Sequence, residues 1–127
     1  MPDSVLDASA LGAIVFGEPD GAAVRRQLSG GRAYAPNLML FELTNIAWKK
    51  IRAHPERAEE YAAGLDDALR FEMQWQAVDY AGVLRLAHTE GISAYDASYL
   101  WLARQLDLPL VTLDRPLAMH ARRKRGP

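Results

Sequence analysis

Apolar residues along the chain follow two patterns, short buried runs and longer stretches with helical spacing. Val5 and Leu6 predict a short buried strand, and further strands are expected at 33–35, 75–78 and 108–114. Pro36 and Asn37 predict a turn after the second strand. The helices predicted between and after these strands cover residues 8–16, about 21–30, 38–53, about 56–71, about 79–89, 94–107 and 117–125.

Strands that alternate with helices or helical hairpins are typical of an α/β fold. The pattern predicts one domain over residues 1–127, with a mostly parallel central sheet of four or five strands and helices on both faces. No internal repeat or linker divides the 127 residues, which is a usual length for one core.

Composition narrows the class of protein. Hydrophobic residues make up 50% and charged residues 24%, as in ordinary globular domains. The absence of cysteine excludes disulfides, thiolate catalysis and a cysteine-based zinc site. The chain has no apolar run as long as a membrane span and no signal-peptide pattern. We therefore expect a cytoplasmic protein without a membrane segment.

The net charge is −1, but the charged residues are distributed unevenly along the chain. All 16 acidic residues but only ten of the 15 basic ones lie in residues 1–114, so this body carries −6 and the remainder +5. Residues 121–127, which contain the run "RRKR", are predicted to form a basic C-terminal tail. The tail is either a solvated chain end or a short arm that contacts phosphates.

Four carboxylates occupy related positions in the predicted topology. Asp7 and Asp114 end predicted strands, Glu42 lies early in the helix after the second strand, and Asp96 begins the helix before the last strand. Because ligands of open α/β sheets bind at the carboxyl ends of the strands, we expect all four to converge. Taken singly, each aspartate also fits a helix N-cap, and Glu42 fits an exposed helix position.

Converging carboxylates repel one another, so they either take up protons or bind a cation. Mg²⁺ and Mn²⁺ prefer oxygen ligands, which makes a hard divalent ion the expected occupant. Small oxygen- or amide-bearing side chains lie close by in the sequence, namely Ser9, Asn45 and Thr112.

Three segments resemble PIN-domain ribonucleases, and more narrowly the VapC-type toxins of toxin–antitoxin pairs. "VLDASALGAIVFGEPDGAAV" is similar to the opening of that family, "FELTNIAWK" to its glutamate segment, and "SAYDASYLWLARQLDLPLVTLDRPLA" to the segment with its last two acids. The resemblance covers residues 5–118. Two features depart from it: Pro116 stands where many members have another acid, and the chain ends at "RRKRGP", where many members have a final strand.

The resemblance implies an endoribonuclease that hydrolyses RNA phosphodiester bonds with Mg²⁺ or Mn²⁺ and an activated water. It makes Asp7, Glu42, Asp96 and Asp114 catalytic. Asp7 and Asp96 would bind the metal directly. Asp114 and Glu42 would bind through water, hold a second ion or orient the nucleophile. The resemblance also implies supporting roles for Ser9, Asn45 and Thr112, and weaker RNA contacts for Lys49, Arg115, Arg122 and Arg123.

The resemblance further implies a homodimer that a cognate antitoxin blocks, with residues 39–48 as part of an apolar groove or simply of the core. The alternative function is a catalytically inactive PIN-like binding or scaffold module that a partner regulates. A receiver domain is disfavoured because no lysine directly follows a predicted strand. A serine hydrolase is disfavoured because the chain has no G-x-S-x-G motif.

Overall fold

Four short parallel strands form the central sheet in a computed structural model that describes residues 3–123. Their spatial order is β3-β2-β1-β4, so β1 lies between β2 and β4. Val5 of β1 pairs with Tyr34 on one side and with Leu110 on the other. The strands are β1 (Ser4–Leu6), β2 (Ala33–Pro36), β3 (Gln74–Gln76) and β4 (Leu110–Val111).

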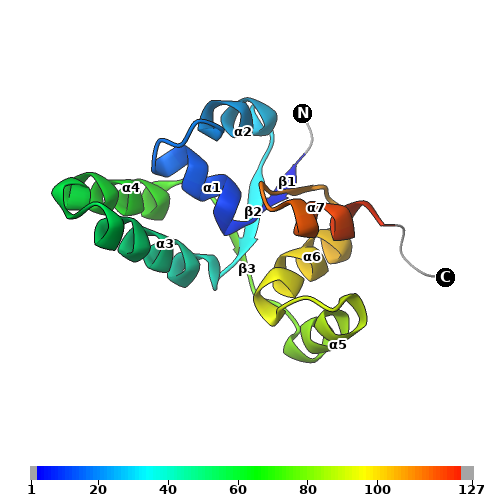
Figure 1. Ribbon diagram of the computed structural model, residues 1–127. Coiled ribbons are helices and arrows are strands. Elements are labelled where there is room, and N and C mark those ends of the chain that lie inside the picture. Colours follow the sequence, from blue (N-terminus) through cyan, green and yellow to red (C-terminus); the bar gives the residue numbers. More distant parts are fainter. Residues whose placement is uncertain (1–2, 124–127) are drawn as a thin grey trace.

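Helices cover both faces of this sheet, as the sequence predicts (Figure 1). Within the described residues they are α1 (Ala8–Val15), α2 (Gly21–Leu28), α3 (Met39–Ala53), the short 3₁₀ helix η1 (Pro55–Arg57), α4 (Ala58–Arg70), α5 (Tyr80–Glu90), α6 (Ala94–Leu106) and α7 (Arg115–Arg122).

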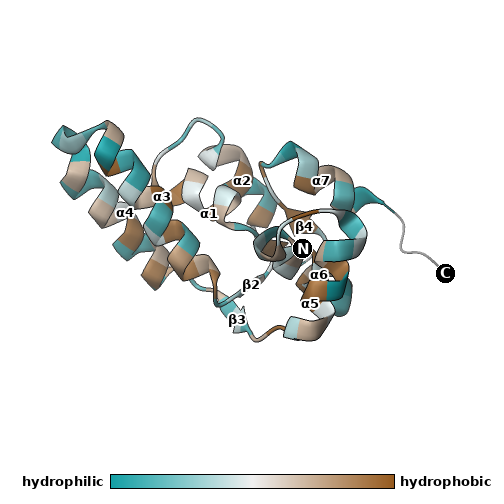
Figure 2. Cartoon of the chain, turned by 60° about the horizontal axis from the view of Figure 1, so that its bottom comes forward, coloured by the Kyte–Doolittle hydropathy of each residue, from teal (hydrophilic) through white to brown (hydrophobic). Residues whose placement is uncertain are grey.

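Side chains of β1 alternate between the two faces, as strand geometry requires. Leu6 packs into the larger core with α1, α3 and α4, whereas Val5 packs against Leu102 and Ala103 of α6. Both Val5 and Leu6 are fully buried, and each such burial contributes roughly 2 kcal/mol. In Figure 2 the helices carry brown hydrophobic residues interspersed with teal hydrophilic ones along the ribbon, as expected for amphipathic helices that cover a sheet.

Two glycines are needed where they stand. A side chain at Gly64 would meet the carbonyl oxygen of Val15 at 2.6 Å, so glycine lets α4 pack closely on α1. Gly91 ends α5 with a φ of 67°, the left-handed conformation that glycine adopts without strain.

Several predicted boundaries are wrong by a few residues. The third strand covers Gln74–Gln76 rather than 75–78, and the fourth covers only Leu110–Val111. Pro36 is the last residue of β2, paired with Gln76, instead of part of the turn. The helix predicted over 56–71 is divided into η1 and α4.

The C-terminal part also differs from the prediction. Helix α7 begins at Arg115 and includes residues 121 and 122, so the predicted tail of 121–127 is helical at its start. Residues 3–123 form four strands and no fifth. Lys124 and Arg125 of the predicted tail lie outside the described residues. Over residues 3–123, no helix combines the length and the apolar character that crossing a membrane requires.

Candidate active site

The four predicted carboxylates line one cavity of about 170 Å³. They reach it from four elements: Asp7 precedes α1, Glu42 lies in the first turn of α3, Asp96 in the first turn of α6, and Asp114 precedes α7. The remaining residues that line the cavity are Ala8, Ser9, Ile46 and Tyr99. The convergence expected from the sequence is therefore present.

Strand order explains how such distant residues meet. Asp7 follows β1, and β1 lies beside β4, whose following loop carries Asp114. On the other side of β1, β2 leads into α3 and Glu42. Because the strands are parallel, their carboxyl ends share one edge of the sheet, and the acids gather there.

Asp7 is both a helix cap and a buried member of the acidic cavity. It is 5% exposed. Its Oδ1 accepts hydrogen bonds from the backbone N–H of Ala10 at 3.0 Å and from the Ser9 hydroxyl at 2.7 Å, while Oδ2 accepts from the Thr112 hydroxyl. The N-cap interpretation is confirmed, and the same carboxylate also lines the acidic cavity.

Two hydroxyls connect Asp7 to the loop between β4 and α7. The Ser9 hydroxyl accepts from the backbone N–H of Leu113 at 3.0 Å, and the Thr112 hydroxyl accepts from that of Asp114, also at 3.0 Å. Each hydroxyl thus donates to Asp7 and accepts from the loop. These bonds hold the backbone N–H groups of Leu113 and Asp114, and Oδ1 of Asp114 caps α7 by accepting from the N–H of Leu117.

Tyr99 is a site residue that the sequence analysis missed. It lines the cavity, is only 2% exposed, and its hydroxyl donates a hydrogen bond to Oε1 of Glu42. A signal was present, because Tyr99 follows Asp96 by three residues and so shares its helix face. That spacing could not identify Glu42, which is 57 positions away, as its partner.

Burial raises the pKa values of three of the four acids, and their mutual charge raises them further. For Asp7, burial acts against hydrogen bonds from Thr112 and Ser9, and the charge of Asp114 adds to the rise. For Glu42, burial raises the pKa against the Tyr99 hydrogen bond, with added repulsion from other acids. For Asp96, burial comes first, followed by the charge of Asp114. The cavity therefore favours either protonated acids or a compensating cation.

The carboxylate oxygens of the cavity are the kind of ligand that the hard divalent cations Mg²⁺ and Mn²⁺ prefer. Within residues 3–123, however, no three Asp, Glu or His side chains are arranged closely enough to hold one ion. A shared ion would require the carboxylates that line the cavity to turn toward one another. Their raised pKa values are the physical reason why a cation would be favoured there.

Not every predicted residue is in the cavity. Asn45 is exposed and is not among the residues that line it; Ile46, four positions after Glu42, is there instead. One helical residue turns by about 100°, so position i+4 lies nearer the direction of Glu42 than position i+3 does. The basic residues predicted to contact RNA are exposed and lie outside the cavity lining: Lys49, Arg115, Arg122 and Arg123.

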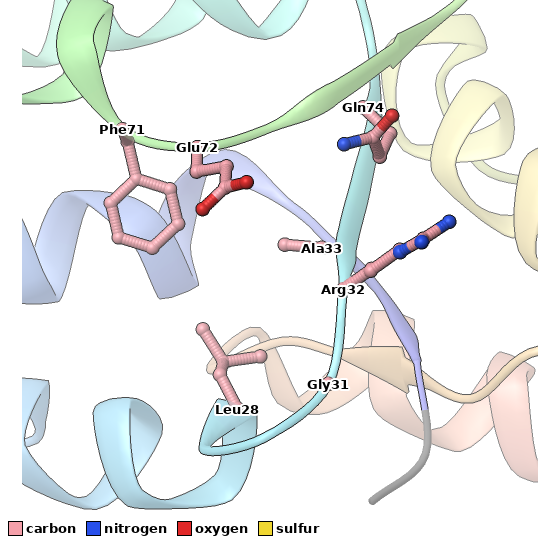
Figure 3. Close-up of a pocket in the computed structure, with 7 residues that line it drawn as sticks. All are labelled: Leu28, Gly31, Arg32, Ala33, Phe71, Glu72 and Gln74. Carbon is pink, nitrogen blue, oxygen red and sulfur yellow. The ribbon is translucent and has the colours of Figure 1, made fainter.

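A larger cavity, of about 260 Å³, lies at the opposite edge of the sheet (Figure 3). It is lined by the first residues of β2 and β3, Ala33 and Gln74, together with Leu28, Phe71 and Glu72 among others. Glu72 is its one carboxylate, so this cavity lacks the charge that distinguishes the acidic one.

Comparisons with known proteins agree with this fold. A family model described as "PIN domain" matches residues 4–122. The chain is similar to Ribonuclease VapC3 of Pyrobaculum aerophilum, with 33% identity over 119 residues, which is 90% of this chain and 91% of that protein. It is also similar to the crystal structure of PAE2754 from the same organism, with a TM-score of 0.78 and 26% identity over 95% of this chain and 86% of that one.

Proposed function

Since the chain belongs to the PIN domain family, we propose that it is a metal-dependent endoribonuclease and the toxin of a toxin–antitoxin pair. The observation that carries this proposal is the cavity in which Asp7, Glu42, Asp96 and Asp114 meet. The likeness to a protein named Ribonuclease VapC3 supports RNA as the substrate. With RNA as the proposed substrate, we also propose a cytoplasmic location.

Asp7, Asp96 and Asp114 are the residues that would hold Mg²⁺ or Mn²⁺. When bound, the ion supplies charge to a phosphoryl oxygen and acidity to a water molecule. The chain's own residues hold the ligands in place: Ser9 and Thr112 orient Asp7 and connect it to the loop that carries Asp114. Such supporting contacts fix the direction in which a ligand oxygen points.

Glu42 has a different role in this proposal. Tyr99 donates to its Oε1, which leaves Oε2 to accept a proton from an attacking water. Burial raises the pKa of Glu42, which makes its carboxylate a better base than an exposed glutamate. Because Glu42 lines the same cavity as Asp7 and Asp96, a phosphodiester held there is within its reach.

RNA reaches this acidic cavity past basic residues on the surrounding surface. Lys49 lies seven residues, about two turns, after Glu42 and so shares its side of α3. Arg115 follows Asp114 directly, and Arg122 and Arg123 lie at the end of α7. All four side chains are exposed, as phosphate contacts require.

An antitoxin and a second copy of the chain are the proposed protein partners. Of the predicted groove at 39–48, Met39 belongs to the core, but Phe41 is 84% and Trp48 51% exposed. Large exposed aromatic side chains on one helix are common where another protein binds. We assign the antitoxin contact to this exposed part of α3.

The test of this function is cleavage of a mixed RNA by the purified protein with Mg²⁺, with Mn²⁺ or with a chelator. We expect internal cuts with either metal, no cuts with the chelator, and recovery when metal is added back. Mapping the RNA ends gives the sequence preference. Equal cleavage in the chelator would contradict metal dependence, and no cleavage under any condition would favour the inactive scaffold module.

Replacing Tyr99 with phenylalanine should lower the cleavage rate about tenfold, in the range seen for residues that orient a ligand or base. The change removes only the hydroxyl that donates to Glu42 and keeps the buried ring. Single-turnover rates at saturating RNA measure the effect. Tyr61→Phe, at another buried tyrosine that packs instead on Phe16, the C-cap of α1, is the matched control. Equal losses in both variants would contradict a specific role for Tyr99.

A further inference from the structure

A polar cluster outside the acidic cavity connects the last three helices. Glu90, at the end of α5, contacts Nδ1 of His120 on α7 at 3.0 Å and Nη2 of Arg104 on α6 at 3.7 Å, all through Oε1. The guanidinium of Arg104 also donates to the backbone carbonyl of His120 at 3.4 Å. In Figure 1 these three helices lie together on the side of the sheet away from α4.

This cluster is more enclosed than the other ion pairs. The Glu90 side chain is 12% exposed and that of His120 19%, whereas the Arg57–Glu60 pair has 46% and 58%. A partly buried carboxylate with a close partner is held more firmly than an exposed one, because water screens it less. The hydrogen bond from His120 and the charge of Arg104 keep the pKa of Glu90 below its usual range.

Helix α7 has few other attachments. Leu117 is its one buried residue, and Met119 is 66% exposed. Its first turn is held through the Asp114 cap, and its last turn through the contacts of His120. A short helix with so little buried apolar surface depends on such polar contacts for its position.

The position of α7 matters to the acidic cavity because Asp114 precedes its first turn. Movement of α7 would therefore change the place of Asp114.

We propose that Glu90 is a positioning residue for the acidic site, which holds α7 through His120 and Arg104 and thereby fixes Asp114. Glu90 does not line the cavity and acts only through α7. The importance of this role for RNA cleavage rests on the proposed function. Its structural part, the fixing of α7 and its cap, stands independently of any activity.

The first test measures amide hydrogen exchange of the metal-free protein in wild type, Glu90→Ala and Glu90→Gln. Glu90→Ala should speed exchange at the amides of Leu117 and Ala118, which bond to Asp114, about tenfold. Amides of α3 should keep their rates. Glu90→Gln keeps an oxygen that accepts from His120, so its rates should lie between those of Glu90→Ala and wild type.

Glu60→Ala is the matched control. Glu60 of α4 also pairs with an arginine, Arg57, but it is not part of the cluster around Glu90. It should leave exchange in α7 unchanged. Wild-type exchange in Glu90→Ala, or an equal increase in α3 and α7, would overturn the proposal, since the first shows no fixing of α7 and the second a general loss of stability.

The second test measures cleavage by the same variants. Glu90→Ala should lower kcat about tenfold with little change in KM for RNA, and Glu90→Gln should recover part of it. An unchanged kcat in Glu90→Ala would overturn the link to the site. If wild type cleaves no RNA, the proposed function fails, while the exchange experiment still decides whether Glu90 fixes α7.

Discussion

Replacing Asp7 with asparagine should lower metal-dependent RNA cleavage by about 10³-fold, because it removes a charge of the acidic cavity. A bound metal contributes several kcal/mol to phosphoryl transfer, and each 1.4 kcal/mol is about tenfold in rate. The fold should be retained, since asparagine keeps an oxygen that can accept from Ala10 and is also a good N-cap. Asp96→Asn, in the first turn of α6, should behave in the same way.

The measurement is the single-turnover cleavage rate with Mg²⁺ or Mn²⁺, with circular dichroism as the check on folding. Asp20→Asn is the matched control, because Asp20 also precedes a helix but is exposed and makes no side-chain cap. We expect it to cleave like wild type. Full activity in folded Asp7→Asn would remove the acidic cavity from the mechanism.

The second large effect concerns the stability of the metal-free protein. At neutral pH, Asp7→Asn should unfold less readily than wild type, by about 1 kcal/mol, because the ionised carboxylate is buried among other acids. The pKa of Asp7 is raised in the folded state. Its favourable contribution is therefore present below the ordinary carboxyl pKa of about 4 and is lost as the pH rises through the higher folded-state value.

The pH dependence separates this effect from ordinary changes in packing. Urea unfolding with a chelator, at about pH 5 and about pH 7, should show a larger stability gain of Asp7→Asn at the higher pH. Adding Mn²⁺ should then stabilise wild type more than the variant, since a ligand stabilises the state that binds it. If metal-free Asp7→Asn is the less stable protein at pH 7, the acid is structural rather than a strained ligand.

Local sequence patterns predicted much of this molecule correctly. The strand at Val5 and Leu6, the helix after Met39 and the order of the elements follow from apolar spacing and turn residues, which act over a few positions. The edge of the sheet where the acids meet follows from parallel topology. Boundaries were less accurate, as at β3 and β4, because the end of a short strand depends on its neighbour's register.

The residues of the candidate site also divide into those that the sequence identifies and those that it does not. Asp7, Glu42, Asp96 and Asp114 could be identified from their places next to predicted strands and helices. Asn45 lies outside the cavity lining, and its predicted supporting role stays a prediction. The rotation of α3 about its axis is set by packing of Leu43 and Ala47 against the core. Helical spacing relates the side chains of α3 to one another, but it does not say how the helix is turned against the rest of the fold.

The sequence by itself determined the order of strands and helices and the four acids that stand at their ends. Only the tertiary structure decided that Thr112 donates to Asp7 across 105 positions, that Tyr99 donates to Glu42, and that Glu90 contacts His120 of α7. The physical reason is the distance along the chain over which each kind of interaction acts. Backbone preferences and apolar periodicity act within a few residues, whereas these contacts arise when helices take their final angles on the sheet.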